Sequence, residues 1–338
     1  MTAYAGIDLH SNNIFLGIID DRNKRLFSQR IANKLSIIKK ALQPFKKVLA
    51  GIVVESTFNW YWLVDGLQEA GYKLHLANPA AIKQYEGIKH TDDKTDAFWL
   101  AQMLMLGILP EGYIYPKDQR PTRDLLRRRM LYVRQRTAHV LSLKSMARRS
   151  LGETISTNRI KQLKPEDAES MFDHSHLKIA CSHALATINF LSSQIKSIER
   201  EVMKTAKIKP ELSSLLTMPG IGNILGQTIM LEVGDIRRFP RAGNYASYCR
   251  CVKSVKLSNE KKKGVNNRRN GNKFLAWAYV EAANFAIRYS PKANRFYNRK
   301  ASRTNNTVAR KALANKMARA SFYIMRDQVA YDESKMFD

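Results

Sequence analysis

The sequence has few cysteines, few acidic residues and no long apolar run. Its three cysteines, Cys181, Cys249 and Cys251, are an odd number without CxxC spacing, which argues against a disulfide framework or a zinc site. No apolar run is long enough to span a bilayer. The chain enters a strand-like pattern at once, without a basic leader, which argues against secretion. We therefore expect a cytoplasmic protein without a membrane partner, long enough at 338 residues for two or three domains.

The shortage of acidic residues is concentrated in one part of the chain. The sequence has 57 Lys and Arg against 29 Asp and Glu, a net charge of +28. Residues 1–118 carry 14 basic and 12 acidic residues, whereas residues 119–338 carry 43 and 17. A nucleic acid is the natural partner, because neutralising its phosphates releases condensed counterions. An anionic membrane is the rival interpretation, but the chain shows no basic amphipathic anchor and no lipidation signal.

The first 118 residues have the pattern of an α/β domain. Strand-like runs at 3–9, 14–20 and 25–31 are joined by polar turns, and alternating helices and strands follow up to a helix over 93–106. This order predicts a ribonuclease H-like mixed sheet with helices on its faces. A doubly wound domain is the alternative, but it would not begin with three strands joined by turns.

The rest of the chain is predicted to be mainly helical. A long basic helix is expected over 123–149, and a second long helix carries a heptad seam of apolar residues over 181–202. The two helices could form a hairpin within one chain or a zipper between two chains. Further helices are expected at 224–233 and 274–287. We therefore expect three domains, at 1–118, 119–207 and 208–338.

Four carboxylates stand out in the first domain. Asp8 lies in the first strand, Glu55 ends the strand after the first helix, and Asp93 and Asp96 share one face of a helix start. Converging carboxylates would repel one another unless a divalent cation lies between them. Mg²⁺, with Mn²⁺ as a substitute, suits such oxygen ligands and phosphodiester chemistry. Each acid alone could be a turn, surface or capping residue, and Asp92 could replace Asp93 as a ligand.

Two downstream features suit nucleic acid. Pro219-Gly-Ile-Gly222 between two helical patterns resembles the turn of a helix-hairpin-helix, which binds a phosphate without reading bases, although an ordinary turn is the simpler alternative. The basic stretches supply further phosphate contacts. The candidate nucleic-acid-binding residues are Arg127, Arg128, Arg129, Gly220, Gly222, Lys261, Lys262, Lys263, Arg268, Arg269 and Lys273.

Ser258 lies in the basic stretch Lys256-Leu-Ser-Asn-Glu-Lys-Lys-Lys-Gly264. A serine hydroxyl is a weak nucleophile, and no histidine is near in the sequence to act as its base. Nearby cations could stabilise an alkoxide and the charge of a pentavalent phosphorus. By spacing alone, a solvated serine or a phosphate contact is the simpler interpretation. Ser254 is a second candidate in a similar setting.

Taken together, these motifs resemble the DEDD transposases of the insertion-sequence family called "one-ten", above all its "eleven-eleven" branch. The match rests on Gly6-Ile-Asp8, on Glu55-Ser-Thr57, on Thr91-Asp-Asp-Lys-Thr-Asp-Ala97, and on Met218-Pro-Gly-Ile-Gly222 with the Ser258 stretch. The resemblance implies a RuvC-like domain, a coiled-coil segment and a C-terminal transposase domain. It implies that Asp8, Glu55, Asp93 and Asp96 hold Mg²⁺ and that Ser258 forms a covalent link to DNA.

The resemblance also implies partners. A structured non-coding RNA from the same element, called a bridge or seek RNA, would pair with target and donor DNA. Acids and serine of one site would come from different subunits of a homo-oligomer, a dimer to tetramer, at the bacterial nucleoid. From the residues alone, a metal-dependent endonuclease resembling a junction resolvase and a non-catalytic nucleic-acid-binding protein are the alternatives. Neither explains both the four acids and the basic segments downstream.

Overall fold

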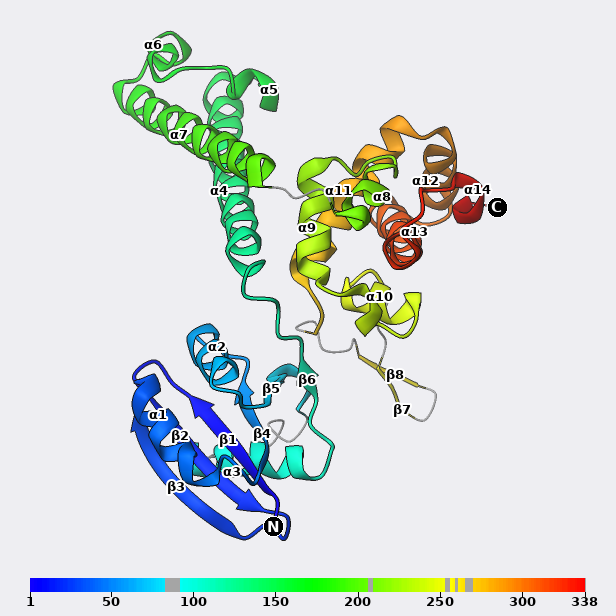
Figure 1. Ribbon diagram of the computed structural model, residues 1–338. Coiled ribbons are helices and arrows are strands. Elements are labelled where there is room, and N and C mark those ends of the chain that lie inside the picture. Colours follow the sequence, from blue (N-terminus) through cyan, green and yellow to red (C-terminus); the bar gives the residue numbers. More distant parts are fainter. Residues whose placement is uncertain (83–91, 206–208, 253–255, 259–260, 265–269, 338) are drawn as a thin grey trace. The chain divides into compact units, whose positions relative to one another are not determined.

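The computed structural model describes residues 1–82, 92–205, 209–252, 256–258, 261–264 and 270–337 (Figure 1). It divides into two compact units. The first is Met1–Lys117, and the second comprises Asp118–Asn266 and Gly271–Asp338. The further domain boundary predicted between residues 207 and 208 lies outside the described residues. None of the described helices is long and apolar enough to cross a lipid bilayer.

A six-stranded mixed sheet forms the centre of the first unit. The strands are β1 (Ala3–Leu9), β2 (Asn13–Asp20), β3 (Arg25–Ala32), β4 (Leu49–Glu55), β5 (Leu74–Ala77) and β6 (Glu111–Gly112), in the spatial order β3-β2-β1-β4-β5-β6. The first three are antiparallel, β4 and β5 run parallel to β1, and β6 is antiparallel. This order confirms the predicted mixed sheet and excludes the doubly wound alternative. It is consistent with the ribonuclease H-like expectation.

The two faces of the sheet are covered by different helices. Side chains alternate along a strand, so residues two apart share a face. Ala5 and Ile7 of β1 pack with α1 (Leu35–Leu42) and α2 (Tyr61–Glu69), and both side chains are fully buried. The opposite face, with Gly6 at its centre, packs against α3 (Asp93–Met105). Both faces are therefore covered, which explains the nearly continuous burial of β1 and β2.

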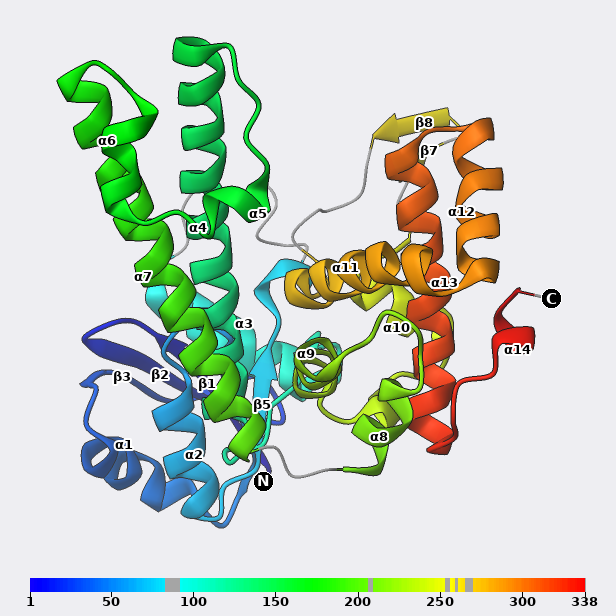
Figure 2. The ribbon, with the colours of Figure 1, turned by 90° about the horizontal axis from the view of Figure 1, so that it is seen from above.

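The second unit begins with a long helical hairpin. It consists of α4 (Arg120–Leu151) and α7 (Ser175–Thr205), with the short helices α5 (Thr157–Ile160) and α6 (Ala168–Met171) between them (Figure 2). The predicted apolar seam is buried at Cys181, Ile188 and Ile195, and Cys181 and Ile188 cluster with Val140 and Leu143 of α4. The intramolecular alternative therefore accounts for the seam, because α7 packs against α4 of its own chain.

The remaining helices surround a second apolar core. They are α8 (Pro210–Leu216), α9 (Asn223–Val233), α10 (Ala242–Tyr248), α11 (Lys273–Tyr289), α12 (Pro291–Arg303), α13 (Asn306–Asp327) and α14 (Glu333–Phe337). Tyr245, Tyr279 and Phe322 fill the centre of this core and are almost completely buried. A two-stranded hairpin, β7 (Lys256–Ser258) and β8 (Lys261–Gly264), follows α10. The second unit is thus mostly helical, as predicted.

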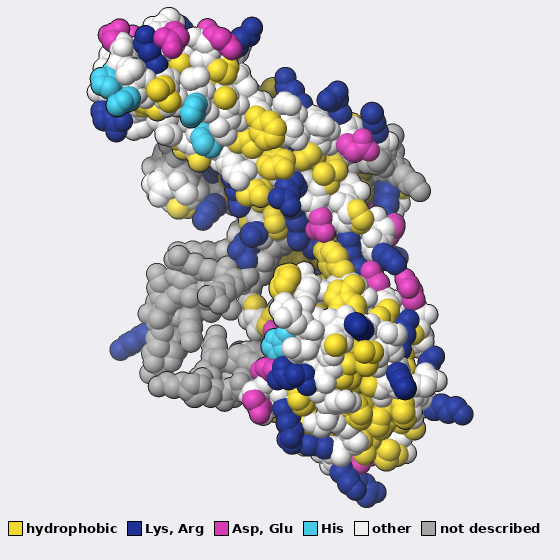
Figure 3. Space-filling model, turned by 90° about the vertical axis from the view of Figure 1, so that its left-hand side faces the viewer, with side chains coloured by type: hydrophobic (Ala, Val, Ile, Leu, Met, Phe, Trp, Pro, Cys, Tyr) yellow, Lys and Arg dark blue, Asp and Glu magenta, His cyan; other side chains and the backbone are white. Residues whose placement is uncertain are grey.

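Lysine and arginine side chains are spread over the face of the molecule in Figure 3, where acidic side chains are sparser. This distribution is the expected consequence of the net charge of +28. A surface of one dominant sign attracts polyanions, and salt weakens that attraction.

Candidate metal site in the first unit

Strand register brings Asp8 and Glu55 to the same edge of the sheet. β1 and β4 are parallel neighbours in which Ile7 pairs with Val54, so Asp8 and Glu55 follow at the same level. Asp8 shares its face with Gly6, and Glu55 shares its face with Val53. Asp8 and Glu55 therefore lie on the sheet face that α3 covers, because Gly6 meets Ala97 and Val53 clusters with Leu100 of that helix. The sequence pattern therefore places two carboxylates at adjacent strand ends, below one helix.

The close approach of α3 depends on a glycine. A Cβ built on Gly6 would lie 1.9 Å from the carbonyl oxygen of Ala97 and 2.8 Å from the amide nitrogen of Ala101. Any side chain at this position would collide with the helix backbone. Since α3 begins at Asp93, the contact carries the first turn of α3, with Asp93 and Asp96, to the strand end that holds Asp8.

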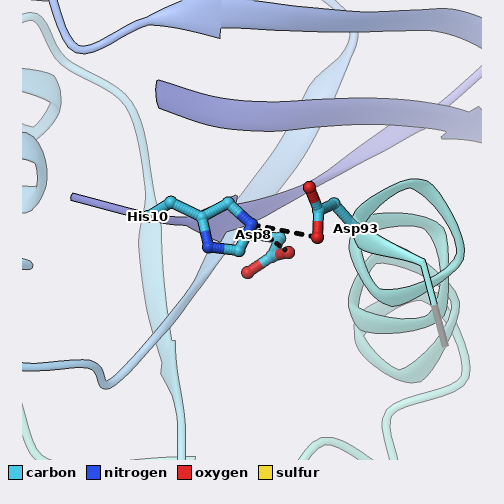
Figure 4. A group of neighbouring side chains, drawn as sticks. All are labelled: Asp8, His10 and Asp93. Carbon is cyan, nitrogen blue, oxygen red and sulfur yellow. Dashed lines mark ion pairs between the residues drawn. The ribbon is translucent and has the colours of Figure 1, made fainter. Parts of the chain in front are cut away.

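Asp8 and Asp93 meet at an imidazole that the sequence analysis did not include. His10 Nε2 lies 3.1 Å from an oxygen of Asp8 and 3.1 Å from an oxygen of Asp93 (Figure 4). One ligand atom from each of the three side chains can be chosen so that all lie within 4.8 Å of one another. His10 follows Asp8 by two residues, and this same-face spacing was the only sequence signal for it.

The backbone of His10 is held by two asparagine side chains. Asn33 Nδ2 and Asn59 Nδ2 each donate a 3.0 Å hydrogen bond to the carbonyl oxygen of His10. The His10 amide in turn donates to the carbonyl oxygen of Asn13 at 2.9 Å. These bonds come from three different segments, so the imidazole starts from a fixed backbone position.

Arg30 of β3 is the second residue missed by sequence reasoning. Its guanidinium donates a hydrogen bond and forms an ion pair with Asp93, and it also bonds the side chain of Asn13 at 2.9 Å. The Arg30 side chain is 54% exposed, so the contact lies at the rim of the cluster. Nothing in the sequence around residue 30 distinguishes this arginine from others.

The electrostatics of the acids differ with burial. Burial raises the pKa of the Asp8 carboxyl above its ordinary value; Asp93 and Asp96 raise it further, while His10 opposes them. Burial also raises the pKa of Glu55, and the charges of Asp8 and Asp96 add to the effect. The structure therefore brings all four acids close enough to affect these pKa values. Glu55 and Asp96 nevertheless lie outside the tight group of Asp8, His10 and Asp93.

Asp92 and Asp93 have different positions at the start of α3. Asp92 is the N-cap residue, and its side chain accepts a 2.7 Å hydrogen bond from the amide of Thr95. That bond lowers the pKa of Asp92. The hydrogen bond from Arg30 lowers the pKa of Asp93, with His10 contributing in the same direction. The structure thus places Asp93, rather than Asp92, at the cluster with Asp8.

The donor set fits a divalent cation. The buried His10 Nε2 lies between two carboxylate oxygens, and neither contact has hydrogen-bond geometry. A cation bound by the imidazole nitrogen and the two carboxylates would give each of these atoms a partner, and it does not require hydrogen-bond geometry between them. Carboxylates suit Mg²⁺, and an imidazole nitrogen in addition suits Mn²⁺ and other transition metals. Asp8, His10 and Asp93 would hold the ion, with Glu55 and Asp96 nearby.

The predicted arginines of α4 separate into different settings. Arg127 makes a two-pronged contact with the buried Glu232 of α9, with one bond of 2.8 Å, and lies over the Phe274 ring. Arg129 pairs with Glu199 of α7 at 2.6 Å, and Arg128 is exposed. Their contacts with nucleic acid stay predictions. In the structure, Arg127 and Arg129 join α4 to its neighbours.

The two predicted glycines precede α9. Gly220 has φ 93°, and a Cβ there would lie 2.3 Å from the carbonyl oxygen of Ala282, so it permits close packing of the turn on α11. Gly222 is the N-cap of α9, is exposed, and has no atom within 4 Å of a built Cβ. Of the two, only Gly222 leaves open space beside the helix start.

The candidate nucleophile ends strand β7. Ser258 pairs with Lys261 of β8, and Lys262 and Lys263 continue that strand. Lys273 is the first residue of α11 and is exposed, with Nζ 5.3 Å from the centre of the Phe274 ring. Ser254, Arg268 and Arg269 lie outside the described residues.

Comparisons with known proteins find relatives for both units. A family model described as "Transposase IS116/IS110/IS902 family" matches residues 212–298. A DEDD transposase model of IS110, described as "Transposase", matches residues 5–150. Together they cover about two thirds of the chain.

The individual relatives share less than 30% sequence identity with this chain. An IS110 protein of 43.6 kDa from Streptomyces coelicolor is 27% identical over 161 residues, which are 47% of this chain and 40% of the relative. An IS116 protein of 44.8 kDa from Streptomyces clavuligerus is 22% identical over 52% of this chain and 44% of its own. The mini-circle putative transposase for IS117 from S. coelicolor is 29% identical over 36% of this chain and 30% of its own.

The aligned regions span less than half the length of each of these relatives. The two family models, however, match separate parts of the chain in the order expected from the sequence motifs. The DEDD model spans Asp8, Glu55, Asp93 and Asp96, and the IS116/IS110/IS902 model spans Ser258. Residues 5–150 are thus similar to the DEDD domain of IS110 transposases, and residues 212–298 are similar to the transposases of the IS116/IS110/IS902 family.

Proposed function

We propose that this chain cuts and rejoins DNA as the transposase of an insertion sequence, guided by a structured RNA. The cluster of Asp8, His10 and Asp93 at the sheet edge carries this proposal. It gives the first unit a place for a divalent cation, Mg²⁺ or Mn²⁺, in a chain whose charge favours a nucleic-acid partner. The sheet order supports a RuvC-like, ribonuclease H-like fold for this unit.

Asp8, His10 and Asp93 of the first unit would hold the cation. A bound cation would neutralise phosphate oxygens and polarise the phosphorus toward attack. Asp8 and Glu55 have raised pKa values, so part of the repulsion among the acids is relieved when they bind a cation or a proton. Arg30 would hold Asp93 in a fixed orientation through their ion pair.

Ser258 is the proposed nucleophile. Its hydroxyl oxygen attacks the phosphorus of a DNA phosphodiester and loses its proton to solvent. The phosphorus–oxygen bond to one deoxyribose breaks, and the released sugar hydroxyl takes up a proton. Rejoining is the reverse, with a hydroxyl of the second DNA as nucleophile. The position of Ser258 at a hairpin rich in lysine supports this role, since cations stabilise the developing charge.

The proposed partners follow from the family resemblance and the charge. Target and donor DNA and a guide RNA from the same element would share the basic surfaces of the second unit. The acids and the serine of one site would come from different subunits of a dimer or tetramer. Such an arrangement would make cutting depend on assembly of the complete complex.

A denaturing gel with labelled DNA tests the proposal. Protein, guide RNA, cognate DNA and Mg²⁺ are incubated together, and a covalent protein–DNA adduct is expected. Ser258→Ala should abolish the adduct, whereas Ser254→Ala should retain it. Loss in Ser254→Ala alone would move the nucleophile to that residue.

The acids are tested in the same assay. Asp8→Asn should abolish both adduct and cleavage while binding of RNA survives. Cleavage without any adduct in the parent protein would contradict the serine mechanism and favour a metal-dependent structure-specific endonuclease. Loss of RNA binding in Asp8→Asn would instead make the acid structural.

A further inference from the structure

A large groove lies within the second unit, between the helical hairpin and the helices that follow it. It has a volume of about 1700 Å³ and is lined by α4, α7, the turn before α9, and α11. The helices α7, α9 and α11 are labelled in Figure 2. A drug-sized or single-nucleotide ligand needs roughly 300–1,000 Å³. The groove is therefore larger than such a ligand requires and has room for a polymer segment.

One wall of the groove carries a row of cations. Lys196, Arg200 and Lys204 of α7 line it at four-residue intervals, and all three are exposed. Like charges at this spacing destabilise a helix. Among the described residues, no ion pair joins any of the three to an acid. The row therefore costs helix stability and suits an anion supplied from outside.

Two further cations of the groove lie close to other positive charges. Arg136 and Lys161 also line the groove. Partial burial lowers the pKa of Arg136, and the charge of Arg129 lowers it further. Partial burial and the charge of Arg136 lower the pKa of Lys161. In all, six cationic side chains line the groove against two acids, Glu199 and Glu281, and Glu199 is already paired with Arg129.

The opposite wall carries aromatic side chains at helical spacing. Trp277, Phe285 and Tyr289 of α11 line the groove, on positions that share one face of the helix. Phe285 is 39% exposed and Tyr289 is 71% exposed. Their rings are nearly parallel, at 7° with centroids 6.5 Å apart. Exposed aromatic rings at such sites act as platforms on which unpaired bases stack.

The turn before α9 forms the floor of the groove. Gly220 and Gly222 line it, and Gly222 offers open space at the N-terminus of an eleven-residue helix. Backbone N–H groups at this position add to the attraction for a phosphate, although they do not by themselves define a site.

We propose that this groove binds a single-stranded nucleic acid, with phosphates along Lys196, Arg200 and Lys204 and bases on Phe285 and Tyr289. The cation row steps by about 6 Å per four residues, comparable to the separation of successive phosphates along a strand. Duplexes keep their bases stacked on one another, so only an unpaired strand uses both walls. The proposal deepens the proposed function, on which it rests for the presence of an unpaired RNA or DNA segment.

Fluorescence anisotropy with the full-length protein tests the groove. The probes are labelled oligo(U) RNA and oligo(dT) DNA of about 20 nucleotides, which exceeds typical single-strand site sizes. The triple variant Lys196→Gln, Arg200→Gln, Lys204→Gln should bind at least about tenfold more weakly at physiological salt. The slope of log affinity against log salt should fall in magnitude by about 2, since three phosphate contacts are lost. The probe that binds with the higher affinity shows whether the bound strand is RNA or DNA.

A matched row provides the control. Arg295, Arg299 and Arg303 of α12 are also exposed, have the same four-residue spacing, and lie outside the groove. Their triple replacement by Gln removes the same charge and should change affinity by less than about twofold. An equal loss in both triple variants would show that net charge alone governs binding and would overturn the proposal.

The aromatic wall is tested separately. Phe285→Ala and Tyr289→Ala should each weaken binding by at least about fivefold without changing the salt slope. Tyr323→Ala on α13, an exposed aromatic outside the groove, is the control. Unchanged binding in both groove variants, or duplex binding as tight as single-strand binding, would contradict the proposal. Altered oligomeric state in light scattering with unchanged affinity would reassign the groove to subunit contact.

The outcome is independent of catalysis. Adduct formation on Ser258 with no groove-dependent binding would leave the proposed function standing and overturn the groove. Groove-dependent binding without any adduct would support the groove and overturn the serine mechanism of the proposed function. Thermal unfolding of each variant checks that the helices are intact.

Discussion

Gly6 and Ala97 meet backbone to backbone, because a Cβ on Gly6 would lie 1.9 Å from the Ala97 carbonyl oxygen. The contact joins β1 to α3. Asp8 follows Gly6 by two residues on the same strand face, and Asp93 precedes Ala97 by four residues on the helix. The distance between strand and helix therefore sets the distance between the two carboxylates.

Gly6→Ala should destabilise the first unit and weaken metal binding. The added methyl must push α3 away from the sheet, and overpacking of this kind costs typically 1–3 kcal/mol or more. Urea unfolding measures the loss, and calorimetric titration with Mn²⁺ measures the affinity. Gly112→Ala is the control, since its Cβ would lie 3.4 Å from the nearest atom, the Leu76 carbonyl oxygen. Equal stability of the two variants would contradict the close contact.

Asp93→Asn should lower Mn²⁺ affinity, because it removes a charged oxygen ligand from the group with Asp8 and His10. The loss should exceed the roughly 10–100-fold that follows removal of an outer hydrogen-bond partner. Asp92→Asn is the matched control, because asparagine caps a helix about as well as aspartate. Calorimetric titration compares the two. A larger loss in Asp92→Asn would make Asp92 the ligand.

Glu55→Gln should stabilise the metal-free protein at neutral pH. Burial holds the folded pKa of Glu55 above its ordinary value of 4.5, so the folded state binds more protons between the two pKa values. The contribution of Glu55 to stability is then fully present below the unfolded pKa and is lost as pH rises through the folded pKa. Gln does not titrate and avoids this loss.

Thermal unfolding in EDTA from pH 4 to 8 checks the sign for Glu55. The difference between Glu55→Gln and the parent should grow in favour of the variant as pH rises. A difference that shrinks with pH would mean that a partner in the folded state stabilises the ionised form.

Glu232→Gln should be far more destabilising than Glu199→Gln. The Glu232 side chain is 2% exposed and meets Arg123, Arg127 and Asn272, the last at 2.7 Å. Breaking a buried ion pair by removing one partner costs about 3–5 kcal/mol, because the remaining charge stays buried. Glu199 is 33% exposed and pairs with Arg129, so its loss should cost at most about 1 kcal/mol. Urea unfolding curves of both variants measure the contrast.

The three thiols should react slowly in the native protein. Burial raises the pKa of Cys181 to about 11 and of Cys251 to about 12, and it raises the pKa of Cys249 as well. The thiolate is the reactive form, so a thiol reagent at pH 8 should modify none of them quickly. Three thiols should react once denaturant is added. Fast reaction at Cys251 alone would show that the half-buried segment after α10 gives reagents access to this thiol.

Much of the fold could be predicted because its signals are local. The hairpin-linked strands and the helix starting at Asp93 follow from alternation, turn residues and the Asp92 cap. Strand β6 was not predicted, since two residues, Glu111 and Gly112, carry no periodicity. The heptad seam indicated a partner for α7 but did not distinguish α4 of the same chain from another subunit.

The candidate site was predictable only in part. Asp8, Glu55, Asp93 and Asp96 are visible in the sequence as acids at strand ends and at a helix start. His10 and Arg30 were missed, because they join the site through packing of segments more than 60 residues from Asp93. Among the arginines of α4, only the structure distinguishes Arg127, held by the buried Glu232, from the exposed Arg128.

The sequence by itself determined the succession of strands β1 to β5 along the chain, the strand-end acids and a strongly basic second unit, because each depends on local pattern or composition. Only the tertiary structure decided which side chains meet. It joined Asp8 to Asp93 through His10, and it set the cation row of α7 and the aromatic row of α11 along one groove. Contacts of this kind depend on how closely whole elements approach, as at Gly6 and Ala97, and spacing along the chain does not encode that distance.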